Sequence, residues 1–154
     1  MVDAGPTNEH FATADSWRAT LPMLTFRPLE PGYTAGHELQ SLQVHIRDHK
    51  QRDLPIGDRS LEAHYGAFVV SQARSSQEEA RRLALAVSYG RGPRERRVAG
   101  HEGRVYPLGP EPAPDDTDGR EPSVVVWSDG DMFYLVASDG LPADTLVDIA
   151  ESLY

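Results

Sequence analysis

Residues 123–138 read SVVVWSDGDMFYLVAS, and this stretch decides the fold. Asp129-Gly130 lies between two apolar runs, which is the strongest short-range signal for a β-hairpin. A type I′ turn at this pair makes Ser128 face Asp131, and counting outward assigns the remaining partners. The predicted cross-strand pairs are Trp127 with Met132 and Val125 with Tyr134 on one face, and Val126 with Phe133 and Val124 with Leu135 on the other.

Both faces of this predicted hairpin are apolar. An antiparallel strand with one face in water alternates apolar and polar residues, whereas residues 124–127 and 132–137 are continuous apolar runs. We therefore expect the hairpin to be central in a sheet and to be covered on both sides.

A helix is predicted directly after the hairpin. Pro142 suits the first helical turn, and the carboxylate of Asp144 lies near the positive end of the helix dipole. The apolar residues that follow recur at helical spacing on one face: Leu146, Ile149, Ala150 and Leu153. This apolar stripe should pack against the sheet.

Further strands are predicted upstream. Leu42, Val44 and Ile46 alternate with polar residues, which indicates a half-exposed strand within residues 39–49. Residues 60–65 and 67–73 form either two strands separated near Gly66 or one long strand with a bulge there. Residues 24–29 are a short candidate strand, and residues 97–99 and 104–106 are a candidate hairpin.

A second helix is predicted in the middle of the chain. Ser75 and Ser76 precede Glu78 and Glu79 at capping-box spacing, and a helical apolar pattern continues to Gly90. The competing interpretation is a strand over residues 85–89. With the helix, the order is strands, helix, strands, helix, so the predicted fold class is α+β, with a mainly antiparallel sheet and two helices.

The chain of 154 residues suits one domain. Residues 1–16 are polar and show no period, so we expect a flexible N-terminal arm, followed by a single α+β domain over residues 17–154. Residues 107–122 hold five prolines and a cluster of acids, which predicts a long loop that is either functional or an insertion.

Composition limits the partners. The formal net charge is −9, which repels a nucleic-acid backbone, and we read the arginines at 91, 94, 96 and 97 as a solvated connection. No stretch approaches the roughly 20 apolar residues of a membrane span, and cysteine is absent. A cytoplasmic location is expected for the chain as written, and an extracytoplasmic one if an anchor or signal has been removed. The excess of Arg over Lys suggests a GC-rich bacterial genome by association.

Two groups of residues are candidates for function. His45 and His64 could hold a metal on neighbouring strands, although surface histidines are the more ordinary reading. Tyr65, Trp127 and Tyr134 could line a surface or pocket for a ligand or partner, although aromatic residues in strands are more often core. No nucleophile, base and orienting group occur at a catalytic spacing, and we expect no catalytic residues, no metal and no cofactor.

The C-terminal pattern also resembles a known family. VVW at 125–127, DG at 129–130, YL at 134–135, SDGL at 138–141 and LVDIAESL at 146–153 are similar to a bacterial domain of unknown function. That domain is commonly found at the extracytoplasmic end of membrane-anchored regulators, including anti-sigma-factor-like proteins. Residues 61–72 and 98–103 resemble its middle part. The resemblance implies an α+β sensor or interaction domain without catalytic residues to carry over.

The leading hypothesis is therefore a non-enzymatic binding or regulatory module, part of a bacterial signalling or envelope regulator. Its partner would be another protein or a small ligand at a sheet face or strand edge. Two alternatives stay open: a small metal-dependent hydrolase that uses His45 and His64, and a structural domain that forms homo-oligomers.

Overall fold

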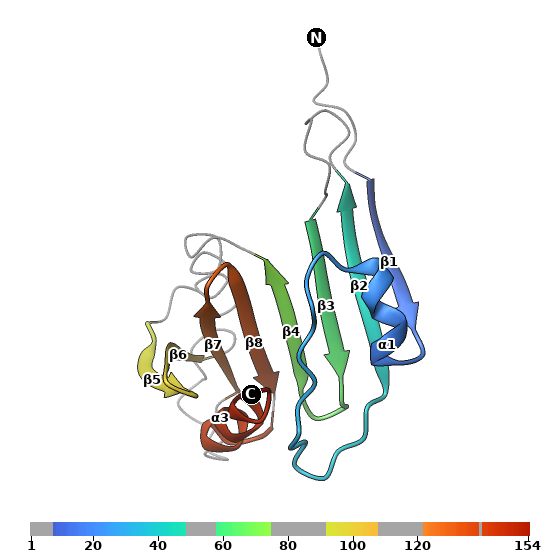
Figure 1. The fold of residues 1–154 in the computed structure, drawn as a ribbon. Helices are drawn as coiled ribbons and strands as arrows, with labels where there is room; N and C mark the ends of the chain where they lie inside the picture. The colour runs from blue at the N-terminus through green and yellow to red at the C-terminus, as the bar shows by residue number, and fades with distance from the viewer. Residues whose placement is uncertain (1–7, 49–57, 75–91, 108–121, 139) are drawn as a thin grey trace.

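The computed structural model describes residues 8–48, 58–74, 92–107, 122–138 and 140–154. They form one sheet of eight strands in the order β1-β2-β3-β4-β8-β7-β6-β5, in which all neighbours are antiparallel (Figure 1). The strands are β1 Asn8–Ala14, β2 Ser41–Asp48, β3 Asp58–His64, β4 Val69–Arg74, β5 Arg94–Val98, β6 His101–Pro107, β7 Ser123–Asp129 and β8 Met132–Ser138.

Two short helices are described, and both pack on the same face of the sheet (Figure 1). Helix α1, Trp17–Thr20, continues into the 3-10 turn η1, Leu21–Met23, and helix α3 is Ala143–Glu151. The mainly antiparallel sheet and the C-terminal helix are therefore confirmed. The order of elements differs, because the first described helix follows β1, and the helix predicted over residues 75–90 lies outside the described residues.

The C-terminal hairpin β7–β8 lies inside the sheet between β4 and β6, as expected. Its predicted register is wrong by two residues. Asp129 pairs with Met132 and Trp127 with Tyr134, so the turn residues are Gly130 and Asp131. Gly130 has φ +61° while Asp131 is not left-handed, which excludes type I′ and matches a type II′ turn with glycine first. Because side chains alternate with period two, a shift of two leaves every side chain on its predicted face.

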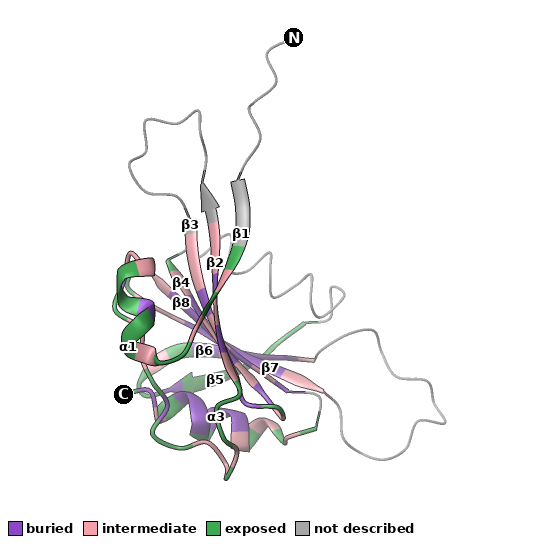
Figure 2. Cartoon of the chain, turned by 90° about the vertical axis from the view of Figure 1, so that its right-hand side faces the viewer, coloured by how far each residue is buried: buried purple, intermediate pink, exposed green. Residues whose placement is uncertain are grey.

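The hairpin is buried on both faces. Trp127 is 2% exposed within the large cluster under α1 and α3, and Phe133 is 7% exposed within a second cluster on the opposite face. Figure 2 shows buried residues concentrated where the strands pass α3, with less burial toward β1. Leu146, Ile149, Ala150 and Leu153 are all buried, which confirms the predicted stripe of the C-terminal helix.

Several upstream predictions are also confirmed. β2 has the alternating pattern, with Leu42 and Val44 buried between partly buried polar neighbours. Of the two alternatives at Gly66, two separate strands is correct: β3 and β4 form a hairpin, and Gly66 adopts φ +83° in its turn. The predicted hairpin forms as β5–β6, but its turn is shorter than expected: it lies at Ala99 and Gly100, whose φ angles of +48° and +84° are both left-handed, and residues 101–103 belong to β6.

Two N-terminal predictions are corrected. Residues 8–14 form edge strand β1 instead of belonging to a flexible arm, because their backbone pairs with β2 in continuous antiparallel register. Residues 24–29 do not form a strand. They cross the helix face of the sheet as a covering segment, with Phe26 buried and Leu29 packed against the core. The side-chain amide of Gln72, in place of a neighbouring strand, binds the backbone of Leu29.

A close approach between strands requires glycine at position 103. A Cβ there would lie 2.6 Å from the carbonyl oxygen of Arg96 and 3.2 Å from that of Val126. Gly103→Ala is therefore expected to lower the free energy of unfolding by about 1 to 3 kcal/mol, since the nearest obstacle is a backbone atom and the buried Val98 side chain lies only 3.0 Å away. Gly140→Ala is the matched control, because nothing lies within 4 Å of its Cβ. Urea unfolding of both variants checks this, and equal stabilities would contradict it.

Candidate functional site

The three aromatic residues singled out from the sequence are all buried. Tyr65, Trp127 and Tyr134 are 4%, 2% and 4% exposed. Trp127 and Tyr134 are direct cross-strand partners whose rings stack with centroids 5.2 Å apart. Tyr65 instead stacks on Phe68 in the β3–β4 hairpin, with centroids 4.7 Å apart. Two of the three predicted residues are thus brought together, and they serve the core rather than an open surface.

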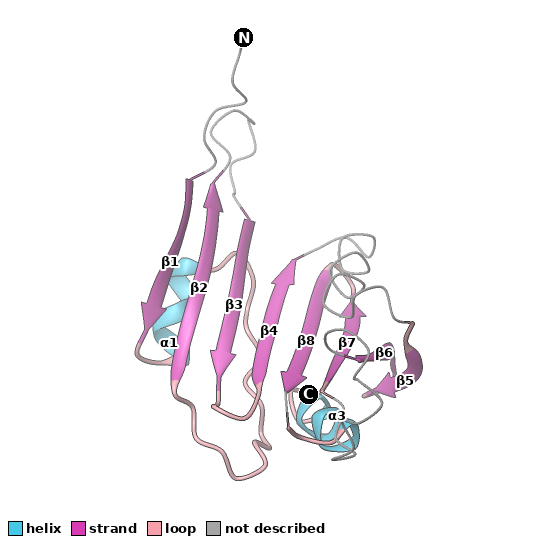
Figure 3. Cartoon of the chain, turned by 180° about the vertical axis from the view of Figure 1, so that it is seen from behind, coloured by secondary structure: helices cyan, strands magenta, loops and turns pink. Residues whose placement is uncertain are grey.

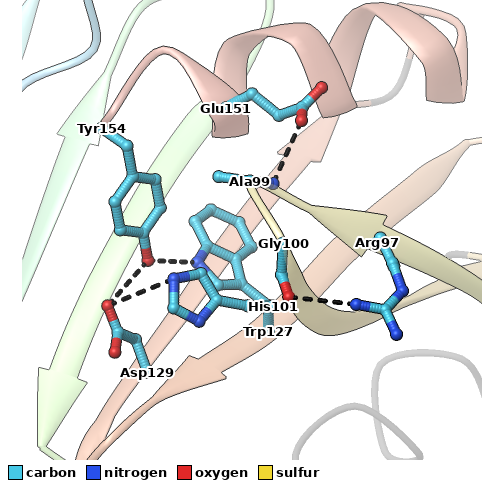
Figure 4. Close-up of polar contacts among 8 residues, drawn as sticks. All are labelled: Arg97, Ala99, Gly100, His101, Trp127, Asp129, Glu151 and Tyr154. Atoms are coloured by element: carbon cyan, nitrogen blue, oxygen red, sulfur yellow. Dashed lines mark hydrogen bonds and ion pairs between the residues drawn. The ribbon is translucent and has the colours of Figure 1, made fainter.

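A polar group, here called the C-terminal cluster, lies at the edge of this aromatic pair and consists of Trp127, Tyr154, Asp129 and His101 (Figure 4). The indole Nε1 of Trp127 donates to the Tyr154 hydroxyl at 3.0 Å, and that hydroxyl donates to Asp129 Oδ2 at 3.2 Å. His101 Nε2 lies 3.5 Å from the same carboxylate oxygen. No sequence pattern predicted this cluster, because only the packing of α3 and β6 brings Tyr154 and His101 to it.

Helix α3 also holds the β5–β6 hairpin (Figure 4). Glu151 Oε2 accepts a hydrogen bond of 3.0 Å from the backbone N–H of Ala99, in the left-handed turn. At the other end of the helix, Asp144 pairs with Arg96 at 3.0 Å. Arg97 Nη1 donates to the carbonyl of Gly100 at 3.3 Å, within the same hairpin. Both ends of α3 therefore contact this hairpin, through Asp144 at the N-terminal end and Glu151 at the C-terminal end.

The electrostatics of the cluster favour neutral tyrosines. Burial, followed by the nearby charges of Tyr154, Asp129 and Asp131, raises the pKa of Tyr134 to about 12. Burial also raises the pKa of Tyr154, although the hydrogen bond from Trp127 opposes the shift. A tyrosine with a raised pKa keeps its proton at neutral pH, so its hydroxyl donates hydrogen bonds and no phenolate is present to act as a base. The described contacts of the cluster therefore favour a structural role, in which they attach the segment after α3 to the sheet.

The free energy of unfolding should fall at alkaline pH because of two buried tyrosines, Tyr134 and Tyr65. The pKa is about 12 for Tyr134 and Tyr65 in the folded protein, against 10.0 for an ordinary tyrosine. Between these values the unfolded chain has lost protons that the folded protein retains, so the stabilisation is complete below pH 10 and declines toward pH 12. The loss is about 2 to 3 kcal/mol at most per tyrosine.

Urea unfolding as a function of pH checks this expectation. Tyr134→Phe should make the alkaline decline shallower, and Tyr134→Phe combined with Tyr65→Phe should make it shallower still, leaving the part that Tyr154 contributes. A decline that is equally steep in the double variant would contradict the assignment to these two residues.

The candidate histidine pair does not converge. His45 faces Ser60 and His64 faces Ser41, so the two histidines lie on one sheet face but four residues apart along the strands. That separation is about 13 Å at roughly 3.3 Å per residue, too far for one ion with ligands at about 2 Å. His64 instead lies 3.1 Å from Glu62 Oε2. Within the described part of the chain, no three His, Cys, Asp or Glu side chains gather in a way that could hold a metal.

One large surface is left uncovered by the described elements. It is the face of β1–β4 turned away from α1 and α3, here called the open face, and it is turned toward the viewer in Figure 3. Its side chains are at least partly exposed and include Phe11, Thr13, Gln43, His45, Ser60, Glu62, His64 and Ser71. Phe11 is 64% exposed, and its ring stacks on that of His45 at 4.5 Å between centroids.

The remaining sequence predictions concern segments and spans. The described residues contain no helix long and apolar enough to cross a bilayer. The loop predicted over residues 107–122 lies outside the described residues except at its two ends. Pro107 is the last residue of β6, and Pro122 directly precedes β7.

No protein-family model, no curated protein and no solved structure matches this chain.

Proposed function

We propose that this protein is a non-enzymatic binding module whose partner is another protein, docked on the open face of β1–β4. The setting we propose is bacterial signalling or envelope regulation, in keeping with the family resemblance of the C-terminal pattern. The single observation that carries the binding role is the aromatic pair of Phe11 and His45 on a mostly polar sheet face that the described elements leave uncovered.

The Phe11 ring is held in place although it is exposed. Phe11 and His45 are direct cross-strand partners, and their planes are tilted by only 14°. A stacked ring loses little freedom when a partner covers it, and burying an aromatic side chain supplies much of the energy of an interface. Aromatic residues are also enriched at the centres of protein interfaces.

The surroundings of the pair suit a polar rim. Gln43, Glu62 and His64 share the open face with it and offer amide, carboxylate and imidazole groups for hydrogen bonds. A sheet face is broad and flat, whereas small ligands are usually held in concave pockets. A folded protein surface therefore fits this face better than a small molecule does.

A metal-dependent hydrolase receives less support. Its two proposed ligands, His45 and His64, lie about 13 Å apart along the strands by the observed register. The third hypothesis, a homo-oligomer, would use the same open face. Light scattering on the purified protein separates a second copy from a different partner.

Site-specific photocrosslinking tests the proposal. A photoreactive phenylalanine analogue is placed at Phe11, and at Leu21 as a control, which is 49% exposed on the helix side of the sheet. We expect adducts with a defined protein from position 11 and not from position 21. For the protein identified, Phe11→Glu should weaken binding at least about tenfold, or about 1.4 kcal/mol, without changing the urea midpoint. Equal adducts from both positions, or unchanged affinity of Phe11→Glu, would refute the proposal.

A further inference from the structure

A second accessible surface lies at the opposite edge of the sheet from β1. Strand β5 ends the strand order, so among the described strands none pairs with its outer edge (Figure 1). No described residue hydrogen-bonds to the backbone N–H and C=O groups of β5 that are directed away from β6, so these groups offer an edge to an added strand.

Strand β5 carries an unusual charge for this chain. Its first four residues, Arg94, Glu95, Arg96 and Arg97, are all exposed, and three of them are arginines. Arg104 of the neighbouring strand faces Glu95. Within the described residues Arg94 makes no ion pair, while Arg97 faces Glu102 across the hairpin and donates to the Gly100 carbonyl. A locally basic edge thus lies on a protein whose formal net charge is −9.

The strand is also held firmly in position. Val98 at its end is fully buried in the core, and the adjoining Ala99 N–H is bound by Glu151 at 3.0 Å. Arg96 is tied to Asp144 of the helix. A template that is already ordered costs little conformational entropy when a partner binds.

We propose that the outer edge of β5 binds an extended acidic peptide as an added β-strand. The peptide backbone would continue the ladder of hydrogen bonds. Its carboxylates would pair with Arg94 on one face of the strand and with Arg97 on the other. This inference goes beyond the proposed function, because it concerns a different edge of the sheet and a different kind of partner.

Two other occupants fit the edge less well. A second copy of β5 paired along this edge would bring two arginine-rich strands together, and like charges in adjacent strands repel. A nucleic acid can neutralise arginines, but its phosphates cannot donate hydrogen bonds to the free carbonyl groups of the strand. At physiological salt, charges are screened beyond about 8 to 10 Å, so the acidic residues elsewhere in the chain repel a short peptide bound at β5 only weakly.

Fluorescence anisotropy on the full chain tests the proposal with a labelled peptide of alternating Glu and Val. We expect saturable binding of this peptide and none of a Lys-Val peptide of equal length. Arg94→Glu combined with Arg97→Glu should weaken binding at least about tenfold. The matched control, Arg18→Glu combined with Arg27→Glu, makes the same change of charge at exposed positions elsewhere and should bind normally.

Two further arms make the outcome decisive. Methylation of alternate peptide nitrogens should abolish binding, since it removes the ladder donors while leaving the charges. Arg94→Gln combined with Arg97→Gln serves as the milder variant if charge reversal impairs folding, which the urea midpoint reports. The proposal would be overturned if the peptide did not bind, or if it still bound after methylation. It would also be overturned if the control variant weakened binding equally, or if a single-stranded oligonucleotide bound as tightly as the peptide.

Discussion

Trp127→Ala is expected to lower the free energy of unfolding by about 3 to 5 kcal/mol, which is the usual cost of truncating a buried tryptophan. Trp127 is 2% exposed, stacks on Tyr134 and donates its indole N–H to Tyr154. Removing it leaves a cavity between α3 and the sheet and takes away the hydrogen bond from β7 to Tyr154, three residues beyond the end of α3. Urea unfolding followed by circular dichroism measures the loss.

Two further variants show where this loss comes from. Trp127→Phe keeps a ring but removes the donor to the Tyr154 hydroxyl, and should cost about 1 to 2 kcal/mol. Tyr33→Ala also truncates an aromatic residue, but at a position that is 46% exposed, and should cost less than about 1 kcal/mol. A Trp127→Ala variant as mild as Tyr33→Ala would contradict the expectation that the buried Trp127 side chain stabilises the fold.

Gln72→Leu is expected to be the second most damaging change, at about 2 to 4 kcal/mol. The Gln72 side chain is fully buried, and its amide makes two hydrogen bonds of 2.7 Å to Leu29, accepting from the backbone N–H and donating to the carbonyl. Leucine has a similar volume but leaves both backbone groups without their partner in a partly buried setting. The free energy of unfolding and the hydrogen exchange of the Leu29 amide both measure the effect.

The same substitution elsewhere provides the control. Gln43→Leu lies on the open face of β2 and should change stability by less than about 0.5 kcal/mol. In Gln72→Leu the Leu29 amide should exchange faster than in the parent protein, while amides of β7 remain protected until global unfolding. Unchanged protection of the Leu29 amide would show that the Gln72 bonds do not hold this segment.

Sequence reasoning succeeded where the pattern was local and repetitive. Alternation around Leu42 and Val44 predicted β2, and the helical spacing of Leu146 and Ile149 predicted the buried stripe of α3. The two faces of the β7–β8 hairpin were also correct, although the turn lies at Gly130 and Asp131. The error did no harm to the faces because the side-chain period of a strand is two.

The candidate sites were harder to predict from the sequence than the strands and the helix. Trp127 and Tyr134 were identified as notable, but whether aromatic strand residues line a pocket or a core depends on what covers them, and here they are 2% and 4% exposed. His45 and His64 could be judged only once the β2–β3 register separated them. The pair of Phe11 and His45 was missed because residues 8–14 carry no alternation strong enough to predict β1.

The sequence by itself determined which side chains turn inward in the hairpins and in the C-terminal helix, because burial of apolar area follows the periods of strand and helix along the chain. Only the tertiary structure decided the order of the eight strands and the edge position of β5. It also decided the hydrogen bonds of Gln72 to Leu29 and the ring contact of His101 with Tyr154. These features depend on contacts between residues far apart in the chain, and local periodicity carries no information about which distant segments become neighbours.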